Sequence, residues 1–380
     1  MKVPLRIALF AALLSATHGE PINEAIQHRM DEFIAEKEIA GAVTLVADPD
    51  KILHLATNGM ADTESFRPMA RDTLFWIASM TKPITATAVM MMAEEGKLSV
   101  DDPVSKYLPE FKELKSSSGK PVEITIKQCL THSSGLADLQ PNEQRGVKTL
   151  EEVIKLVPKK PLLFDPGTKW QYCQSGINTV ARIVEVVSGK NFADFLQERL
   201  FTPLGMKDTC FYPDKDQLGR CASSYERTTE GTLRKVVIPY LPTDPATGEK
   251  SFPRANGGLF STATDYAKFA QMILRGGELD GKRYLKTETV KQMTSVQSGD
   301  LTTGFTPGNG WGLGWCVVRQ PQGVSEALSS GSFGHGGLFG TQAWIDPVKK
   351  RAYILLVQRS NFTNSDNSDV RRAFQNEGAK

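Results

Sequence analysis

The chain has 380 residues, 40% of them hydrophobic and 23% charged, which is typical of a globular protein with an ample core and predicts two domains. Its 45 basic and 43 acidic residues leave a formal net charge of +2, so nothing indicates nucleic acid or an acidic surface as a partner. Five cysteines are too few and too scattered for a disulfide framework or a zinc cluster, although a pairing of Cys210 with Cys221 stays open. No pattern calls for a metal or another cofactor.

The first 19 residues have the pattern of a signal peptide. Lys2 and Arg6 precede an apolar run at 7–14, and small residues follow at 15–17. The run is too short to span a bilayer, and no later stretch is long and apolar enough. We therefore expect an exported protein, periplasmic or extracellular, without a membrane span once processed. An uncleaved anchor is the alternative.

The first part of the chain predicts a helix, a hairpin and a second helix. Apolar residues recur on one helical face between Ile22 and Glu38. Two β-rich runs, 42–47 and 51–57, flank the turn residues 48–50. A long apolar, helix-friendly run then extends from Ile84 to Glu95, and the helix that contains it should begin close to Ser79.

The segment 98–254 reads as short helices near 124–130, 150–157, 175–187 and 192–200, separated by Pro, Gly and Ser. Beyond it, Thr262 and Asp265 fit a capping box that opens a helix through Leu274. Strands are expected at 311–318, 332–339, 341–345 and 352–358, and a last helix at 369–375.

Strands at both ends with helices between them indicate an α/β (α+β) fold with one sheet built from both chain ends. The first and last helices would cover this sheet. The expected division is a sheet domain of residues 20–97 and 255–380, with residues 98–254 inserted as a mostly helical domain.

Ser79 and Lys82 are three residues apart at the predicted start of the second helix, so their side chains project from the same face. A serine hydroxyl becomes a good nucleophile when a neighbouring group takes its proton, and a lysine one turn away can stabilise or relay it. Pro83 fits the first turn, where backbone N–H groups have no intrahelical partner. The simpler interpretation is a helix-capping serine and a solvated lysine.

Two further motifs accompany this pair. Tyr172 lies directly before a predicted helix, where it can be held in a cleft, and a nearby lysine ammonium would favour its phenolate form. Gly334, His335, Gly336 and Gly337 interrupt a predicted strand, which suits the close approach of a ligand and a backbone N–H aimed at an oxyanion. A packing tyrosine, a core histidine and a β-bulge are the alternatives.

The order of these motifs resembles the serine β-lactamase and penicillin-binding-protein superfamily, in the branch of class C β-lactamases, DD-peptidases and related carboxylesterases. The resemblance covers essentially the whole chain after the predicted signal peptide. It rests on Ser79-Met80-Thr81-Lys82, Tyr172-Cys173-Gln174 and His335-Gly336-Gly337, supported by the stretches 130–136 and 340–347.

The resemblance implies a β-lactamase/transpeptidase-like fold with an antiparallel sheet. It also implies that Ser79 is the acylated nucleophile, that Lys82 is its proton partner and that Tyr172 is the general base. The backbone N–H groups of Ser79 and Leu338 would form the oxyanion hole. Whether Lys82 or Tyr172 first removes the serine proton stays open.

The same resemblance places Gln174, His335, Gly336 and Gly337 in the substrate site, and Gln140 at an amide-binding position. Two departures stand out. Gln174 replaces the family's asparagine, and His335-Gly336-Gly337 replaces Lys-Thr-Gly, whose lysine and threonine hold a substrate carboxylate. His335 should be mostly neutral at pH 7, because an unperturbed histidine has a pKa of about 6.5.

These observations favour a serine hydrolase acting on small or medium esters through an acyl-enzyme. The alternatives are a β-lactamase or D-Ala-D-Ala carboxypeptidase with the same mechanism, and an inert binding protein that kept the fold. No His-x-x-x-His pair supports metal-dependent hydrolysis, and no Gly-x-Ser-x-Gly motif supports an α/β-hydrolase. We expect the loops 137–147 and 240–254 to shape the pocket.

Overall fold

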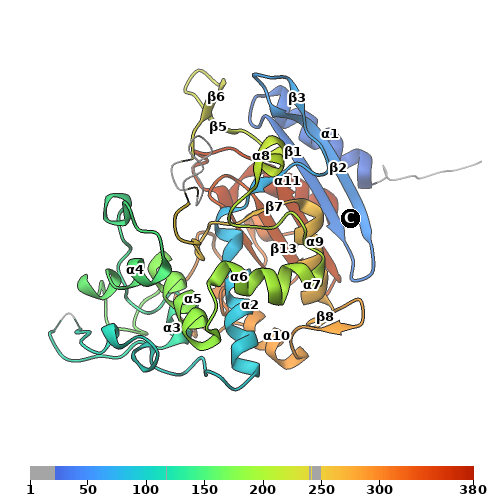
Figure 1. The fold of residues 1–380 in the computed structure, drawn as a ribbon. Helices are drawn as coiled ribbons and strands as arrows, with labels where there is room; N and C mark the ends of the chain where they lie inside the picture. Colours follow the sequence, from blue (N-terminus) through green and yellow to red (C-terminus); the bar gives the residue numbers. More distant parts are fainter. Residues whose placement is uncertain (1–21, 117, 239–240, 242–249) are drawn as a thin grey trace, which may run out of the picture.

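The computed structural model describes residues 22–116, 118–238, 241 and 250–380, so the predicted signal peptide lies outside it (Figure 1). Its centre is an eight-stranded antiparallel sheet in the order β10-β11-β12-β13-β14-β1-β2-β3. The strands are β1 Gly41–Ala47, β2 Ile52–Asp62, β3 Arg67–Pro68, β10 Asn309–Trp311, β11 Cys316–Val318, β12 Phe333–Gly336, β13 Gln342–Asp346 and β14 Arg351–Leu356.

The two ends of the chain meet where β1 pairs with β14, from Val43 opposite Leu356 to Ala47 opposite Ala352. This pairing confirms a single sheet built from both chain ends. β1 is buried along its whole length, because helices cover both faces of the sheet there. The antiparallel sheet with helices on both faces is the architecture that the sequence predicts.

On one face of the sheet pack α1 (Ile22–Ala35) and α11 (Asp369–Gly378), which contact each other. Their apolar residues join Val46 and Tyr353 of the sheet in one cluster: Ile26, Met30, Phe33, Val370 and Phe374. On the other face, α9 (Ala263–Leu274) packs against β1 and β14, and α2 (Thr81–Glu94) against β12. These two faces bury the alternating side chains of the central strands.

The first hairpin is confirmed, and its turn is closed by Asp48, whose carboxylate accepts hydrogen bonds from the N–H groups of Asp50 and Lys51, each at 2.8 Å. The strand expected at 311–318 is instead a second hairpin, β10 and β11. Its turn contains Gly314 at a φ of +75°, where an added Cβ would lie 2.6 Å from the Cβ of Ala86. Both the positive φ and the close packing against α2 therefore favour glycine at this turn.

The middle of the chain holds short helices, as expected, but also a β-hairpin. The helices are α3 Ile126–Leu130, α4 Leu150–Ile154, α5 Gln174–Ser188, α6 Phe192–Leu196, α7 Thr202–Leu204 and α8 Lys215–Arg220, and α10 Thr287–Thr294 follows later. Three two-stranded sheets pair β4 (Phe75–Trp76) with β7 (Phe260–Ser261), β5 (Ser224–Arg227) with β6 (Leu233–Val236), and β8 (Glu278–Leu279) with β9 (Lys282–Arg283). α2 contacts both α5 and the sheet, so it connects the helical region with the rest (Figure 1). No helix among the described residues is long and apolar enough to cross a membrane.

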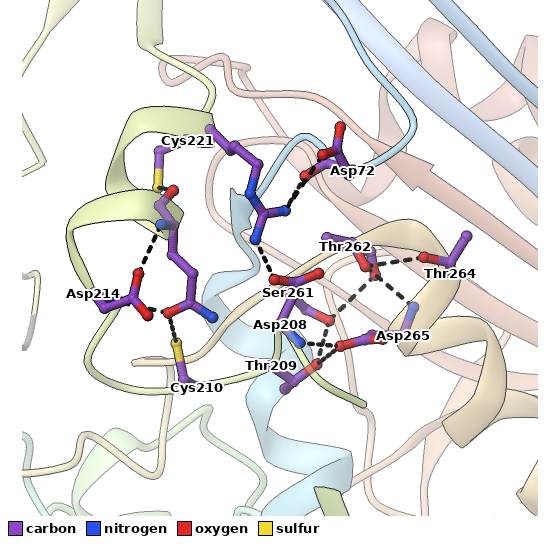
Figure 2. Close-up of polar contacts among 12 residues, drawn as sticks. Asp72, Asp208, Thr209, Cys210, Asp214, Cys221, Ser261, Thr262, Thr264 and Asp265 are labelled. Atoms are coloured by element: carbon purple, nitrogen blue, oxygen red, sulfur yellow. Dashed lines mark hydrogen bonds and ion pairs between the residues drawn. The ribbon is translucent and has the colours of Figure 1, made fainter. Parts of the chain in front are cut away.

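The start of α9 shows half of the predicted capping box (Figure 2). The hydroxyl of Thr262 accepts a hydrogen bond from the N–H of Asp265 at 3.2 Å. The carboxylate of Asp265 does not return to Thr262; it accepts from the N–H of Asp208 at 2.7 Å and from the hydroxyl of Thr209 at 3.2 Å. It thereby ties α9 to the loop before α8 instead of closing the box.

The same view shows that Cys210 and Cys221 are free thiols and not a disulfide (Figure 2). Each contacts a different part of Gln217: the Cys210 Sγ lies 3.5 Å from the side-chain oxygen, and the Cys221 Sγ lies 3.4 Å from the backbone oxygen. The pairing of Cys210 with Cys221, which the sequence left open, is therefore absent from this structure.

Candidate active site

Ser79 lies in a sharp turn between β4 and α2. The turn is a single 3₁₀ turn, Ala78–Met80, and Ala78 adopts a φ of +45°, which is uncommon for a residue with a side chain. The hydroxyl of Thr81 holds it by donating to the Ala78 carbonyl at 2.7 Å and accepting from the N–H of Leu259 at 3.2 Å. Such strain costs of order 1–3 kcal/mol and is typical of functional sites. The helix begins beside Ser79, as predicted, with the hydroxyl at its positive end.

Lys82 is fully buried, and its Nζ has three oxygen neighbours: Ser79 Oγ at 3.0 Å, Gln174 Oε1 at 2.8 Å and the Asn256 carbonyl at 2.6 Å. Burial lowers the pKa of Lys82 to about 7, although the charge of Asp138 acts the other way. The neutral amine is therefore well populated at pH 7. Its two N–H groups satisfy the two carbonyl oxygens, which leaves its lone pair for the Ser79 proton.

The hydroxyl of Tyr172 lies 3.3 Å from the Nε2 of His335, and the Lys82 Nζ lies over the Tyr172 ring, 4.6 Å from its centroid. The lysine thus faces the ring, and burial raises the pKa of Tyr172 well above 10, although a hydrogen bond with the Ser79 hydroxyl opposes this. The expectation that Lys82 eases deprotonation of Tyr172 is therefore wrong. Tyr172 is a neutral phenol in the resting site.

The tautomer of His335 follows from its partners. Its Nδ1 lies 2.7 Å from the Gly336 carbonyl, which only accepts, so Nδ1 carries the proton. Nε2 is then the acceptor for the Tyr172 hydroxyl. Burial lowers the pKa of His335 to about 3, which confirms that it is neutral at pH 7. When Lys82 is an ammonium, the Ser79 hydroxyl can donate to the Tyr172 oxygen, and the Tyr172 hydroxyl donates to His335.

The two glycines after His335 have different neighbours. A Cβ added at Gly337 would lie 2.1 Å from the Thr341 hydroxyl and 2.7 Å from the Ile77 carbonyl, so only a bare backbone lets the end of β12 approach the Ser79 turn. A Cβ at Gly336 would lie 1.9 Å from Oδ1 of Asp366. The carboxyl group of Asp366 therefore occupies the space in which a threonine side chain would begin.

Gln174 reaches Lys82 despite its extra methylene. It is the first residue of α5, and Asp138 fixes this helix end, because its Oδ1 accepts the N–H groups of Gln174 at 2.7 Å and Ser175 at 2.8 Å. The Gln174 Oε1 also accepts from the Asn256 side chain at 3.0 Å. Although glutamine replaces asparagine here, an amide oxygen still accepts a hydrogen bond from Lys82.

A cavity of about 800 Å³ opens above Ser79. Tyr172, Gln174, His335, Gly336, Gly337 and Leu338 line it, so most of the predicted site residues come together. Gln140 does not line it: this residue is exposed at the start of a 3₁₀ turn, where its N–H donates to the Glu143 carboxylate at 2.6 Å. The nearby Gln144 lines the cavity instead.

The sequence analysis did not name several of the residues that line the cavity. Asp138 and Arg254 come from the loops expected to shape the pocket, part of which (240, 242–249) lies outside the described residues. Asn256, Phe305 and the segment 361–366 carried no motif. Their positions depend on long-range packing, which no local pattern reveals.

An aromatic cluster supports Tyr172 from below. His132 is fully buried, with its ring centroid 4.5 Å from that of Tyr172, and its Nδ1 accepts from the N–H of Cys173 at 3.1 Å. The rings of Trp170 and Trp311 pack around both. This packing fixes the ring and hence the direction of the hydroxyl.

Comparisons with known proteins agree with this geometry, and the solved structures confirm the β-lactamase/transpeptidase-like fold that the sequence predicts. The family model described as Beta-lactamase matches residues 22–376. Protein Rv1367c of Mycobacterium tuberculosis is 34% identical over 333 residues, covering 80% of each chain, and esterase EstB of Burkholderia gladioli is 28% identical over 382 residues, covering 93% of this chain and 92% of its own. The solved structure of EstCE1, a hydrolase with promiscuous acyltransferase activity, is 25% identical with a TM-score of 0.80 and covers 95% of this chain and 98% of its own. Other relatives include penicillin-binding proteins and putative D-alanyl-D-alanine carboxypeptidases.

Proposed function

Because the chain belongs to the beta-lactamase family of serine hydrolases, we propose that it is a carboxylesterase that acts on small or medium esters through an acyl-enzyme on Ser79. The observation that supports this most directly is the contact of the buried Lys82 Nζ with the Oγ of Ser79, a residue that lines the open cavity. A binding protein without catalysis would not need a buried lysine whose pKa is held at about 7 beside a serine hydroxyl.

In the proposed acylation step, neutral Lys82 takes the Ser79 proton as the oxygen attacks the ester carbonyl. The carbonyl oxygen becomes an oxyanion, and the backbone N–H groups of Ser79 and Leu338 stabilise it. The close approach of Gly337 to the Ser79 turn supports this assignment, because it brings the start of the β12–β13 loop beside the nucleophile.

Tyr172 is proposed to protonate the leaving alkoxide when the tetrahedral intermediate collapses. Its raised pKa keeps a proton available, and its hydroxyl neighbours both Ser79 and His335. Acylation leaves Lys82 as an ammonium and Tyr172 as a phenolate. In deacylation the attacking water gives its proton to Tyr172, and Lys82 returns its proton to the Ser79 oxygen as the acyl group leaves. The roles of base and acid are thus divided between Lys82 and Tyr172.

Esters are favoured over β-lactams and D-Ala-D-Ala peptides because the end of β12 lacks the lysine and threonine that hold a substrate carboxylate in the family, and Arg254 elsewhere in the lining is bound to Gln144. Gly336 offers no hydroxyl, and a neutral His335 that already holds the Gly336 carbonyl offers no cation. The relatives named as an esterase and as a hydrolase support the same choice. The relatives named as penicillin-binding proteins keep the β-lactam and peptide reactions as the second candidate.

One experiment tests the proposal: the turnover of a chromogenic butyrate ester and of a chromogenic cephalosporin by the same preparation, with Ser79→Ala as control. We expect Ser79-dependent ester turnover with a higher kcat/KM than for the cephalosporin. Faster cephalosporin turnover would establish the second candidate. An absence of turnover of either substrate would contradict the esterase proposal.

A further inference from the structure

The segment between β14 and α11 carries Asp366 into the cavity wall next to His335 and Gly336. Its side chain is partly buried, and its backbone is fixed, because the Asp366 N–H donates to Asn364 Oδ1 at 3.0 Å and the Asp366 carbonyl accepts from Arg371 at 2.5 Å. The carboxyl group is therefore a built part of the wall.

The other charged groups of the cavity already have close partners. Asp138 accepts two backbone N–H groups at the start of α5, and Arg254 donates to Gln144 at 2.6 Å. Lys82 faces three oxygens. Among the described residues, the carboxylate of Asp366 accepts a single hydrogen bond, from Gln342 at a long 3.3 Å. The Arg371 guanidinium donates to the Asp366 backbone carbonyl, and its charge acts on the carboxylate together with that of Lys82. The carboxylate can still accept further hydrogen bonds.

The chemistry of the site places Asp366 on the side of the leaving group. Tyr172 protonates the leaving oxygen, and its hydroxyl lies 3.3 Å from His335, the neighbour of Gly336. Asp366 in turn abuts Gly336, since a Cβ there would lie 1.9 Å from Oδ1. An alcohol group that extended from the leaving oxygen along β12 would reach the part of the cavity wall that Asp366 lines.

Resting on the proposed esterase function, we infer that Asp366 determines leaving-group specificity: it rejects esters of alcohols that carry a negative charge and favours neutral or cationic ones. An anionic leaving group would meet the Asp366 carboxylate in a partly desolvated wall, where repulsion between like charges is stronger than in water, while the Arg371 guanidinium that acts on this carboxylate is itself fully buried behind the wall. A cationic group, such as a quaternary ammonium, would gain a charge partner. Where the family has a threonine that helps to bind a substrate carboxylate, this site would have a carboxylate that repels one.

The test uses three butyrate esters with the leaving groups phenol, 3-hydroxybenzoate and 3-(trimethylammonio)phenol, at about pH 8 so that the carboxylate is ionised. Each kcat/KM is divided by the rate constant of hydroxide hydrolysis, which removes intrinsic reactivity. We expect the wild type to prefer the cationic over the anionic ester by roughly tenfold or more, given the strength of such charge interactions near a protein surface. Asp366→Asn keeps the shape of the side chain but removes its charge. It should bring the corrected ratio of the cationic to the anionic ester close to one.

Asp369→Asn is the matched control. It removes the same charge three residues further on, from the exposed first turn of α11, where Asp369 pairs with Arg372 at 3.2 Å, and it should leave the ratio unchanged. If the wild type prefers the anionic ester after division by the hydroxide rate constants, the inference is overturned. It is also overturned if the wild type and Asp366→Asn have the same ratio of cationic to anionic ester. The esterase proposal fails separately, if hydrolysis of the neutral phenyl ester does not depend on Ser79.

Discussion

The Nζ of Lys82 lies 3.0 Å from the Oγ of Ser79, and its two other contacts are carbonyl oxygens, those of the Gln174 side chain and the Asn256 backbone. A carbonyl oxygen cannot donate, so these two contacts use two of the lysine's hydrogens in either protonation state. The third position, facing Ser79, holds a proton in the ammonium form and a lone pair in the neutral form. Protonation of Lys82 thus switches the serine between a stabilised and an activated state.

Ser79→Ala should abolish ester hydrolysis and leave the fold intact. The hydroxyl is partly exposed at a helix start, so its loss should cost at most about 1–2 kcal/mol of unfolding free energy. Turnover and thermal unfolding of both proteins measure this. A serine-directed phosphonate probe should label the wild type and not the variant, and a variant with more than a small fraction of wild-type turnover would exclude Ser79 as the nucleophile.

Lys82→Ala and Tyr172→Phe should each lower kcat by at least about a hundredfold, as expected for the loss of a general base or acid. The double variant should be little worse than either single variant, because groups that pass one proton between them act as a unit. The measurement is kcat for one ester in the four proteins. Multiplicative losses would show that the two side chains work independently.

The acidic limb of the pH profile should report Lys82. Its pKa is lowered from 10.5 to about 7, and the neutral form is the active base, so kcat/KM should fall as the pH drops through about 7 and stay high above it. His335, with a pKa of about 3, should not contribute to this limb. The profile of His335→Gln is the control: its limb should stay near pH 7. If that variant loses the limb, the titrating group is the histidine.

The motif residues were predictable from sequence because local rules fix them. The spacing of Ser79 and Lys82 needs one helical turn, and the chain indeed starts α2 there. The protonation of Tyr172 was not predictable, because it depends on whether the lysine faces the hydroxyl or the ring, which long-range packing decides.

Two further misses have the same cause. Gln140 was expected at an amide-binding position because of its place in a loop, yet it lies at the start of a 3₁₀ turn and is exposed to solvent. Asp366 had no motif at all; it reaches the site only because its segment folds back across β12 and β13 after the sheet is complete. The substrate-contacting loops are therefore the part of the site that required the structure.

Gly337→Ala should damage both stability and catalysis. The added methyl group would lie 2.1 Å from the Thr341 hydroxyl and 2.7 Å from the Ile77 carbonyl, and the latter is backbone that cannot rotate away. Overpacking of this kind typically costs about 1–3 kcal/mol of unfolding free energy. The strand end would also move away from Ser79, which would misplace the N–H of Leu338 and lower kcat by a hundredfold or so if that group stabilises the oxyanion.

Gly219→Ala in α8 provides the matched control, because a Cβ there meets nothing within 4 Å and the helix favours alanine over glycine. It should keep wild-type kcat and unfold at the same temperature or slightly higher. Chemical denaturation and kcat for one ester, measured on both variants, separate the two effects. A Gly337→Ala protein that is destabilised yet keeps its kcat would place the oxyanion hole elsewhere than at Leu338.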